Sequence, residues 1–229
     1  MVSHAPGDDV PQTLARSDAD GFDIALRRRR TPAGEVVELI VNGMFAMDSQ
    51  DTTSEYALAD LVPVDAAGVL VGGLGLGYTA DRLAERLPHA RIDVVDLSAA
   101  LVGWARAGLT DTLARVASAS GVTIGQADVA DVLTGRRPPH GPWDAILLDV
   151  DNGPDFLIHD RNARIYGDHL LSRACARLTP GGLLAVWSEH ESAELDARMR
   201  ALGSATGVHT VTVERDGHRI DYAIHWLRR

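Results

Sequence analysis

The sequence predicts an α/β fold, with a mostly parallel sheet that helices cover on both faces. Three observations support this class. From residue 68 onward, short apolar runs alternate with segments of helical pattern. The first of these runs leads into a glycine-rich turn at 72–77. The composition of the 229 residues, 45% hydrophobic and 24% charged, is that of a folded globular protein.

The segment before residue 63 carries a different pattern. Residues 1–20 are rich in Asp, Ala, Ser and Pro and lack the apolar stretch of a secretory signal, so we expect a flexible tail. We expect residues 21–62 to form a hairpin and a helix. Apolar runs flank Asn42-Gly43, a pair that readily adopts the positive φ of a type I′ turn, which predicts a hairpin over 36–47. A helix over 51–61 follows it.

Residues 63–229 form one predicted domain that carries the alternating pattern. Its parallel strands are expected at 69–71, 92–95, 122–124, 143–148 and 183–187. Its helices are expected at 78–87, 98–108, 128–133, 167–178 and 192–202. A closing antiparallel pair, 210–214 and 219–226, turns at Asp216-Gly217 and brings the sheet to seven strands.

The glycine-rich turn lies where doubly wound sheets bind their ligands, directly after the first strand. Its glycines are Gly72, Gly73, Gly75 and Gly77. Glycine lets the backbone approach a ligand closely, and the helix that follows presents free N–H groups to a carboxylate. Taken alone, such a turn also suits an NAD enzyme or is only a tight turn.

An acidic residue follows each of the next three strands. Asp96, with Leu97 beside it, ends the second strand about 20 residues after the turn, where an acid accepts hydrogen bonds from ribose hydroxyls. Asp128 and Val129 follow the third strand, in position to meet an adenine amino group, and Asp149 ends the fourth. A helix cap or a solvated strand end explains each acid singly. Three of them beside a glycine turn predict a nucleoside site.

Charge and cysteine content limit the expected binding partners and the expected cellular compartment. A net charge of -10 repels nucleic-acid phosphates, so we expect no nucleic-acid partner and favour a small or cationic substrate. No aromatic residue interleaves with Arg27–Arg30, which we interpret as a solvated strand end or turn. The single cysteine, Cys175, is expected to be a buried thiol in a cytoplasmic protein. No apolar run reaches the roughly 20 residues of a membrane span, so we expect no membrane partner.

On these motifs the chain resembles the polyamine aminopropyltransferases (spermidine synthases), and more closely their uncharacterised bacterial relatives. The matching segments are 41–43, 49–55, 71–78, 149–154 and 178–182, together with Asp96 and Asp128. The resemblance implies a Rossmann-like class I methyltransferase fold and a homodimer. It also implies decarboxylated S-adenosylmethionine as cofactor, with Asp96 on the ribose, Asp128 near adenine, and Asp149 holding and deprotonating the attacking amine.

Departures from the family pattern change the expected reaction. The family's turn, G-G-G-D-G-G, places an aspartate on the aminopropyl amine where this chain has Gly75. A hairpin glutamine of the family corresponds to Ala46, and the family's D-S-S-D spacing becomes Asp149-Val150-Asp151. A turn without the acid is compatible with the carboxylate of intact S-adenosylmethionine. We therefore expect methyl transfer to a small-molecule acceptor, with Asp149 as catalytic residue, and keep aminopropyl transfer to a polyamine as the alternative.

Several other residues fit either a role in the site or an ordinary structural role. The candidate substrate contacts are Asp151, His159 and Glu189, for which exposed loop positions are the competing interpretation. We expect surface or edge positions, and no metal site, for three histidines without metal-ligand spacing: His209, His218 and His225. Core or edge packing is the interpretation of Trp143, Trp187 and Trp226.

Two functions of other classes stay open. One is a non-catalytic nucleoside-binding or scaffold protein that kept the fold without the chemistry. The other is an NAD-linked oxidoreductase, which the closing antiparallel pair disfavours. Measuring the binding of S-adenosylmethionine, its decarboxylated form, methylthioadenosine and NAD would distinguish these hypotheses.

Overall fold

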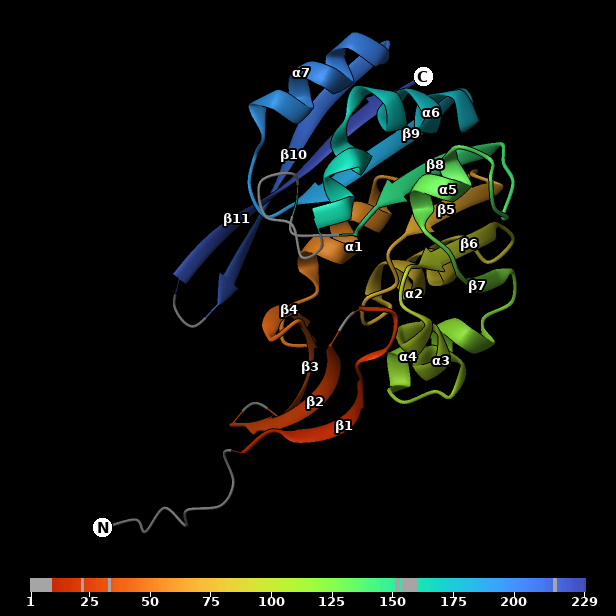
Figure 1. The fold of residues 1–229 in the computed structure, drawn as a ribbon. Helices are drawn as coiled ribbons and strands as arrows, with labels where there is room; N and C mark the ends of the chain where they lie inside the picture. Colours follow the sequence, from red (N-terminus) through yellow and green to blue (C-terminus); the bar gives the residue numbers. More distant parts are fainter. Residues whose placement is uncertain (1–9, 22, 33, 151–152, 154–159, 216–217) are drawn as a thin grey trace.

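Two β-sheets organise the chain (Figure 1). The computed structural model describes residues 10–21, 23–32, 34–150, 153, 160–215 and 218–229. The larger sheet has seven strands in the order β10-β11-β9-β8-β5-β6-β7. They are β5 (Gly68–Gly72), β6 (Arg91–Asp96), β7 (Val122–Gln126), β8 (Trp143–Leu148), β9 (Leu178–Ser188), β10 (Ala205–Arg215) and β11 (His218–Arg228). Strands β5 to β9 pair in parallel and β11 runs antiparallel to β9 and β10, which confirms the predicted sheet.

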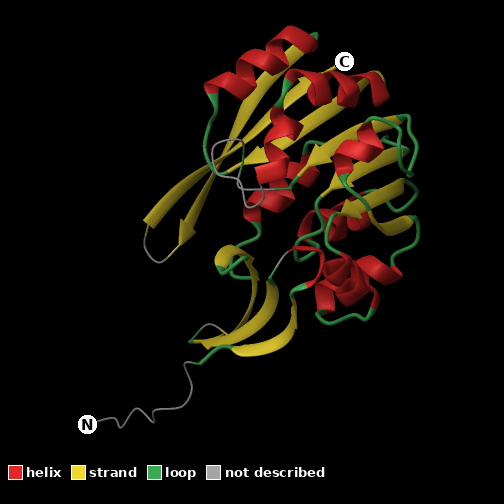
Figure 2. Ribbon diagram, in the orientation of Figure 1, coloured by secondary structure: helices red, strands yellow, loops and turns green. Residues whose placement is uncertain are grey.

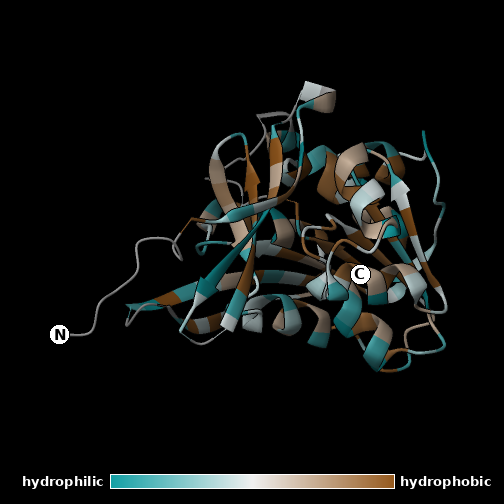
Figure 3. Ribbon diagram, turned by 90° about the horizontal axis from the view of Figure 1, so that it is seen from below, coloured by the Kyte–Doolittle hydropathy of each residue, from teal (hydrophilic) through white to brown (hydrophobic). Residues whose placement is uncertain are grey.

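Helices cover both faces of the larger sheet (Figure 2). They are α1 (Thr53–Asp60), α2 (Tyr78–Arg86), α3 (Ala99–Arg106), α4 (Asp111–Ser118), α5 (Val129–Leu133), α6 (Asp168–Arg177) and α7 (Ala193–Leu202), with a 3-10 helix, η2, at Asp160–Tyr166. Alternate residues of β5 face the two layers, because side chains alternate across a strand. Val69 and Val71 share a core with residues of α1 to α4, whereas Leu70 packs with residues of α5, α6 and α7. In Figure 3, which colours the ribbon by hydropathy, hydrophobic residues lie along the strands in the interior.

The smaller sheet precedes the large domain and has the order β1-β2-β3-β4 (Figure 1). Its strands are β1 (Gln12–Ser17), β2 (Ile24–Thr31), β3 (Gly34–Val41) and β4 (Met44–Asp48), all antiparallel, with a short 3-10 helix, η1 (Ala19–Gly21), between the first two. The predicted hairpin is β3 and β4. It turns at Asn42, with φ 52°, and Gly43, with φ 77°, as a type I′ turn requires.

The structure differs from the sequence-based expectation before this hairpin. Residues 12–17 were assigned to a flexible tail, but they form β1 and pair with β2. Residues 27–30 lie inside β2 rather than at a strand end. Neither strand has a strong apolar alternation in its sequence. Each forms because its backbone pairs with a neighbouring strand, and a local sequence pattern does not predict such long-range pairing.

The expectation for His225 was wrong. Strand β11 lies between β9 and β10 rather than at the edge, so His225 is only 1% exposed. Its Nε2 accepts a hydrogen bond from the Ser192 N–H at 3.1 Å, and burial lowers the pKa of the imidazole. His209 and His218 are exposed, and Trp143 and Cys175 are buried, as expected. Among the described helices, none combines the length and apolarity needed to cross a membrane.

Candidate functional site

A cavity of about 190 Å³ lies at the carboxyl ends of β5, β6 and β8, where α1 and the smaller sheet face them. One part of its lining follows the parallel strands: Gly73, Gly75, Val95, Asp96, Leu97, Ser98, Leu101, Ala127, Asp128, Val129, Asp149 and Val150. The other part comes from more distant elements: Ile24, Leu39, Val41, Phe45, Ala46, Met47, Asp48, Asp51, Ser54, Glu55, Asn162, Ile165, Trp187, Val213 and Tyr222. The charged members of both described sets are all acids. The cavity therefore favours a cation.

Two glycines of the turn, Gly73 and Gly75, line the cavity with their backbone. A Cβ on Gly73, at φ +100°, would lie 1.8 Å from the carbonyl oxygen of Asp149. The backbone of the turn and the end of β8 are thus in direct contact, and the Asp149 N–H donates to the Gly72 carbonyl at 2.7 Å. The turn then enters α2, whose N-cap is Gly77 at φ 91°. The close approach seen here is to the backbone of Asp149, whereas the approach of the glycines to a ligand stays a prediction.

Asp96 holds the turn as well as lining the cavity. Its Oδ2 accepts the Leu74 N–H and its Oδ1 accepts the Ser98 N–H, both at 2.8 Å. Burial raises the pKa of this carboxyl, while the backbone N–H groups of Leu74, Ser98 and Gly75 act in the opposite direction. A carboxylate has about four acceptor sites, so these three N–H groups leave one for a hydroxyl of a ligand.

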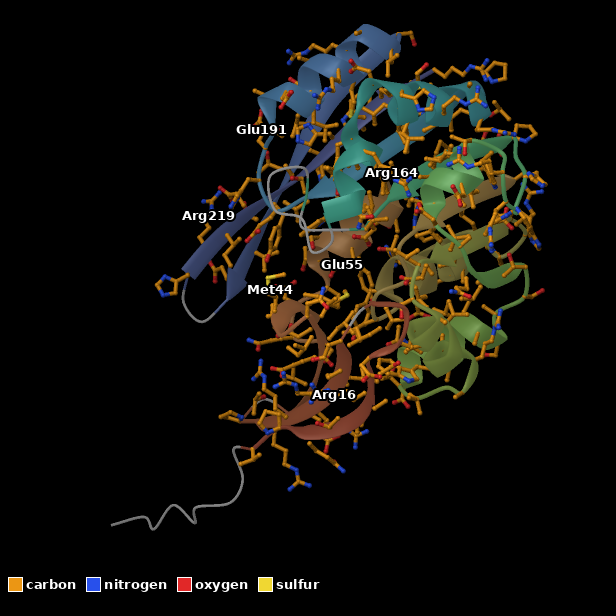
Figure 4. All side chains as sticks on the ribbon, in the orientation of Figure 1. Arg16, Met44, Glu55, Arg164, Glu191 and Arg219 are labelled. Carbon is orange, nitrogen blue, oxygen red and sulfur yellow. The ribbon has the colours of Figure 1, made fainter. Side chains whose placement is uncertain are left out.

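Asp128 follows β7, which pairs with β6 in the sheet, and it has two partners. Its Oδ1 accepts the Ala130 N–H at 2.8 Å and so caps α5. Its Oδ2 forms an ion pair with Arg164 of η2 (Figure 4). Asp128 therefore both caps α5 and lines the cavity. Leu97 and Val129 supply apolar surface beside the two acids.

Asp149 and Glu55 form the second feature of the cavity, a pair of buried carboxyl groups. Asp149 Oδ2 accepts a hydrogen bond from the Thr79 hydroxyl, and Glu55 Oε2 accepts one from the Ser54 hydroxyl, each at 2.8 Å. Burial raises the pKa of Asp149 to about 6, although the Thr79 hydroxyl lowers it. Burial raises the pKa of Glu55 to about 7, and the negative charge of Asp149 adds to this effect. Two neighbouring carboxyl groups that titrate near neutrality form a proton-accepting site.

Glu55 was not a candidate site residue in the sequence. In the helix predicted over 51–61 it was an ordinary acid near a helix start, a position that favours acids for local reasons. It reaches the cavity because α1 packs against α2, which brings Glu55 near Asp149 at the end of β8 (Figure 4). The only signal in the sequence was its place at the end of the segment 49–55, which carries part of the resemblance.

The remaining candidates divide between the cavity and its surroundings. Glu189 follows β9 and is not part of the cavity lining. Asp151 and His159 lie outside the described residues. Trp187, interpreted from the sequence as packing, lines the cavity beside Tyr222, with ring centroids 5.2 Å apart. The Trp187 Nε1–H is buried and has no hydrogen-bond partner among the described residues, so it is available to a ligand.

Comparison with known proteins gives one family and several structural neighbours. The family model of the methyltransferase small domain matches residues 37–220. A trans-aconitate 2-methyltransferase of Paracidovorax citrulli (strain AAC00-1) is 32% identical over 142 residues, which are 61% of this chain and 45% of that relative. The chain thus spans less than half the length of that curated protein.

The structural neighbours have the same fold at low sequence identity. A spermidine synthase in complex with the transition-state analogue AdoDATO has a TM-score of 0.74 and 14% identity, over 95% of this chain and 73% of that chain. The spermidine synthase from Thermotoga maritima has a TM-score of 0.72 and 13% identity, over 95% and 72% of the two chains. These likenesses confirm the expected α/β fold, and they cover the smaller four-stranded sheet, of which the sequence predicted only the hairpin.

Proposed function

Because the chain belongs to the methyltransferase small domain family, we propose that it transfers a methyl group from S-adenosylmethionine to a small-molecule acceptor. The observation that carries this proposal is the pair of buried carboxyl groups, Asp149 and Glu55, beside the glycine turn. S-adenosylmethionine supplies a methyl group on a sulfonium, which an incoming nucleophile displaces. The protein has to align the nucleophile, exclude water and take up a proton.

The residues of the cavity fit the adenosyl part of this cofactor. Asp96 has an acceptor site left for a hydroxyl group, and Asp128 would meet an adenine amino group once the Arg164 side chain shares or releases it. Gly73 and Gly75 line the cavity with backbone rather than with side chains. We assign the adenosyl end to the Asp96–Asp128 side and the reacting end to Asp149.

We assign the acceptor to the class of amines. Asp149 and Glu55 line the cavity, and among the described residues no cationic side chain shifts the pKa of either. A protonated amine would bind there and lose its proton to Asp149, whose pKa of about 6 leaves it ionised at neutral pH. The nitrogen lone pair then forms the new N–C bond as the C–S bond breaks, and that electron pair stays on sulfur. The Thr79 hydroxyl would hold Asp149 Oδ2, which leaves Oδ1 for the acceptor.

Aminopropyl transfer is the second candidate, and the acid-lined cavity is what favours it. A decarboxylated donor carries a terminal ammonium and no carboxylate, so its charge also suits an acidic site. The spermidine synthases that share the fold are named for such a product.

Product analysis tests the two candidates. The protein is incubated with either sulfonium and a panel of primary and secondary amines, and the nucleoside product is identified by mass spectrometry. We expect S-adenosylhomocysteine, which only methyl transfer releases, and we expect Asp149→Asn to abolish it. Methylthioadenosine, formed from the decarboxylated sulfonium in the presence of an amine, would show aminopropyl transfer instead of methyl transfer. Tight binding of either sulfonium without turnover would favour the non-catalytic alternative.

A further inference from the structure

Met47 reaches from the smaller sheet onto the glycine turn of the larger one. It lies on β4, and its Sδ accepts a hydrogen bond from the Leu76 N–H at 3.3 Å. A Cβ built on Gly75 would lie 2.6 Å from the same sulfur, and Gly75 itself has φ +50°. The Met47 side chain thus occupies the space that a side chain at position 75 would need.

The contact itself adds no charge to the turn. Gly75, Leu76 and Met47 are uncharged, and the carboxylate of Asp96 beside them accepts the N–H groups of Leu74 and Ser98. The N–H group that Met47 covers belongs to Leu76, just before the Gly77 N-cap of α2, where the positive end of the helix dipole favours a negative partner. Thioether sulfur is a weak acceptor, so a stronger one can displace it.

We propose that Met47 determines which sulfonium the protein accepts, because it caps the turn with an uncharged side chain that a carboxylate can displace and an ammonium cannot. The inference rests on the proposed function, since it requires that the cofactor's tail reaches the turn. A carboxylate replaces the sulfur as acceptor of the Leu76 N–H, and the charge makes the new hydrogen bond stronger. The ammonium of a decarboxylated tail has no lone pair with which to accept the Leu76 N–H, so it cannot replace the sulfur at this position. The selectivity for intact S-adenosylmethionine therefore comes from the smaller sheet as well as from the turn.

The test introduces an acid at position 47 rather than at position 75, where the positive φ and the contact with Met47 would strain any side chain. Met47→Glu places a carboxylate near the present position of the sulfur. Met47→Gln has a similar shape without the charge. Met44→Glu makes the same charge change at the start of the same strand, at an exposed residue outside the cavity lining (Figure 4). Calorimetry measures binding of S-adenosylmethionine, its decarboxylated form and methylthioadenosine, which lacks the tail.

We expect the unmodified protein to bind S-adenosylmethionine at least about tenfold more tightly than the decarboxylated form, the factor of one charge-assisted hydrogen bond. Met47→Glu should lower this ratio by about tenfold or more, while Met47→Gln and Met44→Glu leave it within about threefold. Methylthioadenosine should bind all four proteins alike. An unchanged ratio in Met47→Glu, or a preference of the unmodified protein for the decarboxylated form, overturns the role of Met47.

Two further outcomes would have causes other than the role of Met47: failure of the protein to bind the cofactor, and failure of the variant to fold. If the unmodified protein binds none of the three compounds, the proposed function fails and the inference with it. If Met47→Glu does not fold, which loss of methylthioadenosine binding would show, Met47→Ala replaces it. Freeing the Leu76 N–H should then raise the ratio by about threefold or more, and no change would overturn the proposal.

Discussion

At the scale of single residues, burial decides what the acids of this chain can do. Asp96, Asp149 and Glu55 are chemically ordinary carboxylic acids, yet burial raises the pKa of each, and hydrogen bonds counteract the effect to different extents. Asp96 accepts backbone N–H groups at both oxygens, which suits a fixed acceptor of hydrogen bonds. Asp149 and Glu55 each accept one hydroxyl, which suits groups that exchange a proton.

Replacing Asp96 tests its place in the cofactor site. Asp96→Ala should weaken binding of methylthioadenosine and S-adenosylmethionine by roughly 1–3 kcal/mol, because a hydroxyl group loses a charged acceptor. Calorimetry measures the change. Asp65→Ala, at an exposed position, is the control for loss of one negative charge. Equal affinities of the Asp96 variant and the control would remove Asp96 from the site.

The raised pKa of Glu55 predicts a dependence of stability on pH. The folded protein keeps this proton up to about pH 7, whereas the unfolded chain releases it near the ordinary glutamate pKa of 4.5. The stabilisation is therefore complete below pH 4.5 and is lost as the pH rises through 7, by up to about 3 kcal/mol. Asp149, with a pKa of about 6, contributes a loss of the same sign.

Urea unfolding between pH 4.5 and 8 measures this dependence. We expect Glu55→Gln to flatten the decline, so that the variant gains stability relative to the unmodified protein as the pH increases. Glu85→Gln changes an exposed acid of α2 and should leave the decline as it is. Parallel curves for the Glu55 variant and the unmodified protein would contradict the burial of Glu55.

At the scale of elements, the smaller sheet shapes the site from outside the large domain. It contributes the strand that carries Met47 and Asp48, and it leads directly into α1, which carries Glu55. Arg29 of β2 joins its strands at the cavity end. The guanidinium pairs with Glu38, lies 3.4 Å from Asp48 and donates to Gln50 at 3.0 Å.

Removing this arginine should destabilise the smaller sheet. Arg29→Ala leaves the carboxylate of Asp48, only 3% exposed, with less compensating charge, and we expect a loss of about 1–3 kcal/mol in the free energy of unfolding. Arg30→Ala removes an arginine whose side chain is 75% exposed and should cost little. Chemical denaturation compares the two variants. Equal midpoints would mean that the Arg29 contacts do not stabilise the sheet.

At the scale of the whole molecule, the smaller sheet stands beside the large domain rather than inside it (Figure 1, Figure 2). Its order, β1-β2-β3-β4, leaves β1 and β4 as its edges. One face is covered, because Ile24, Leu26 and Leu39 belong to the core shared with α1 to α4. Open strand edges invite pairing with another chain.

We predict a homodimer that forms through this sheet. Light scattering after size exclusion should give twice the 24.5 kDa of one chain, at low and at high salt, because pairing of strands and apolar surface does not depend on charge. A mass of one chain at every protein concentration would rule the dimer out.

The sequence by itself determined the features that depend on local conformation and on period. Asn42-Gly43 turns a hairpin because only a few residue pairs accept two positive φ angles, and the apolar runs 69–71 and 143–148 are strands because both of their faces are buried. The glycine turn and the acids after successive strands followed from the same logic, since parallel strands end at one edge of the sheet.

Only the tertiary structure decided which distant residues meet. Strand β1 exists because β2 offers it an edge, and His225 is buried because β11 inserts between β9 and β10. Glu55 reaches Asp149, and Met47 reaches Leu76, across 94 and 29 positions of the chain (149 less 55, and 76 less 47). No local propensity encodes such pairs, because they form when elements pack, and the free energy of that packing is distributed over the whole core.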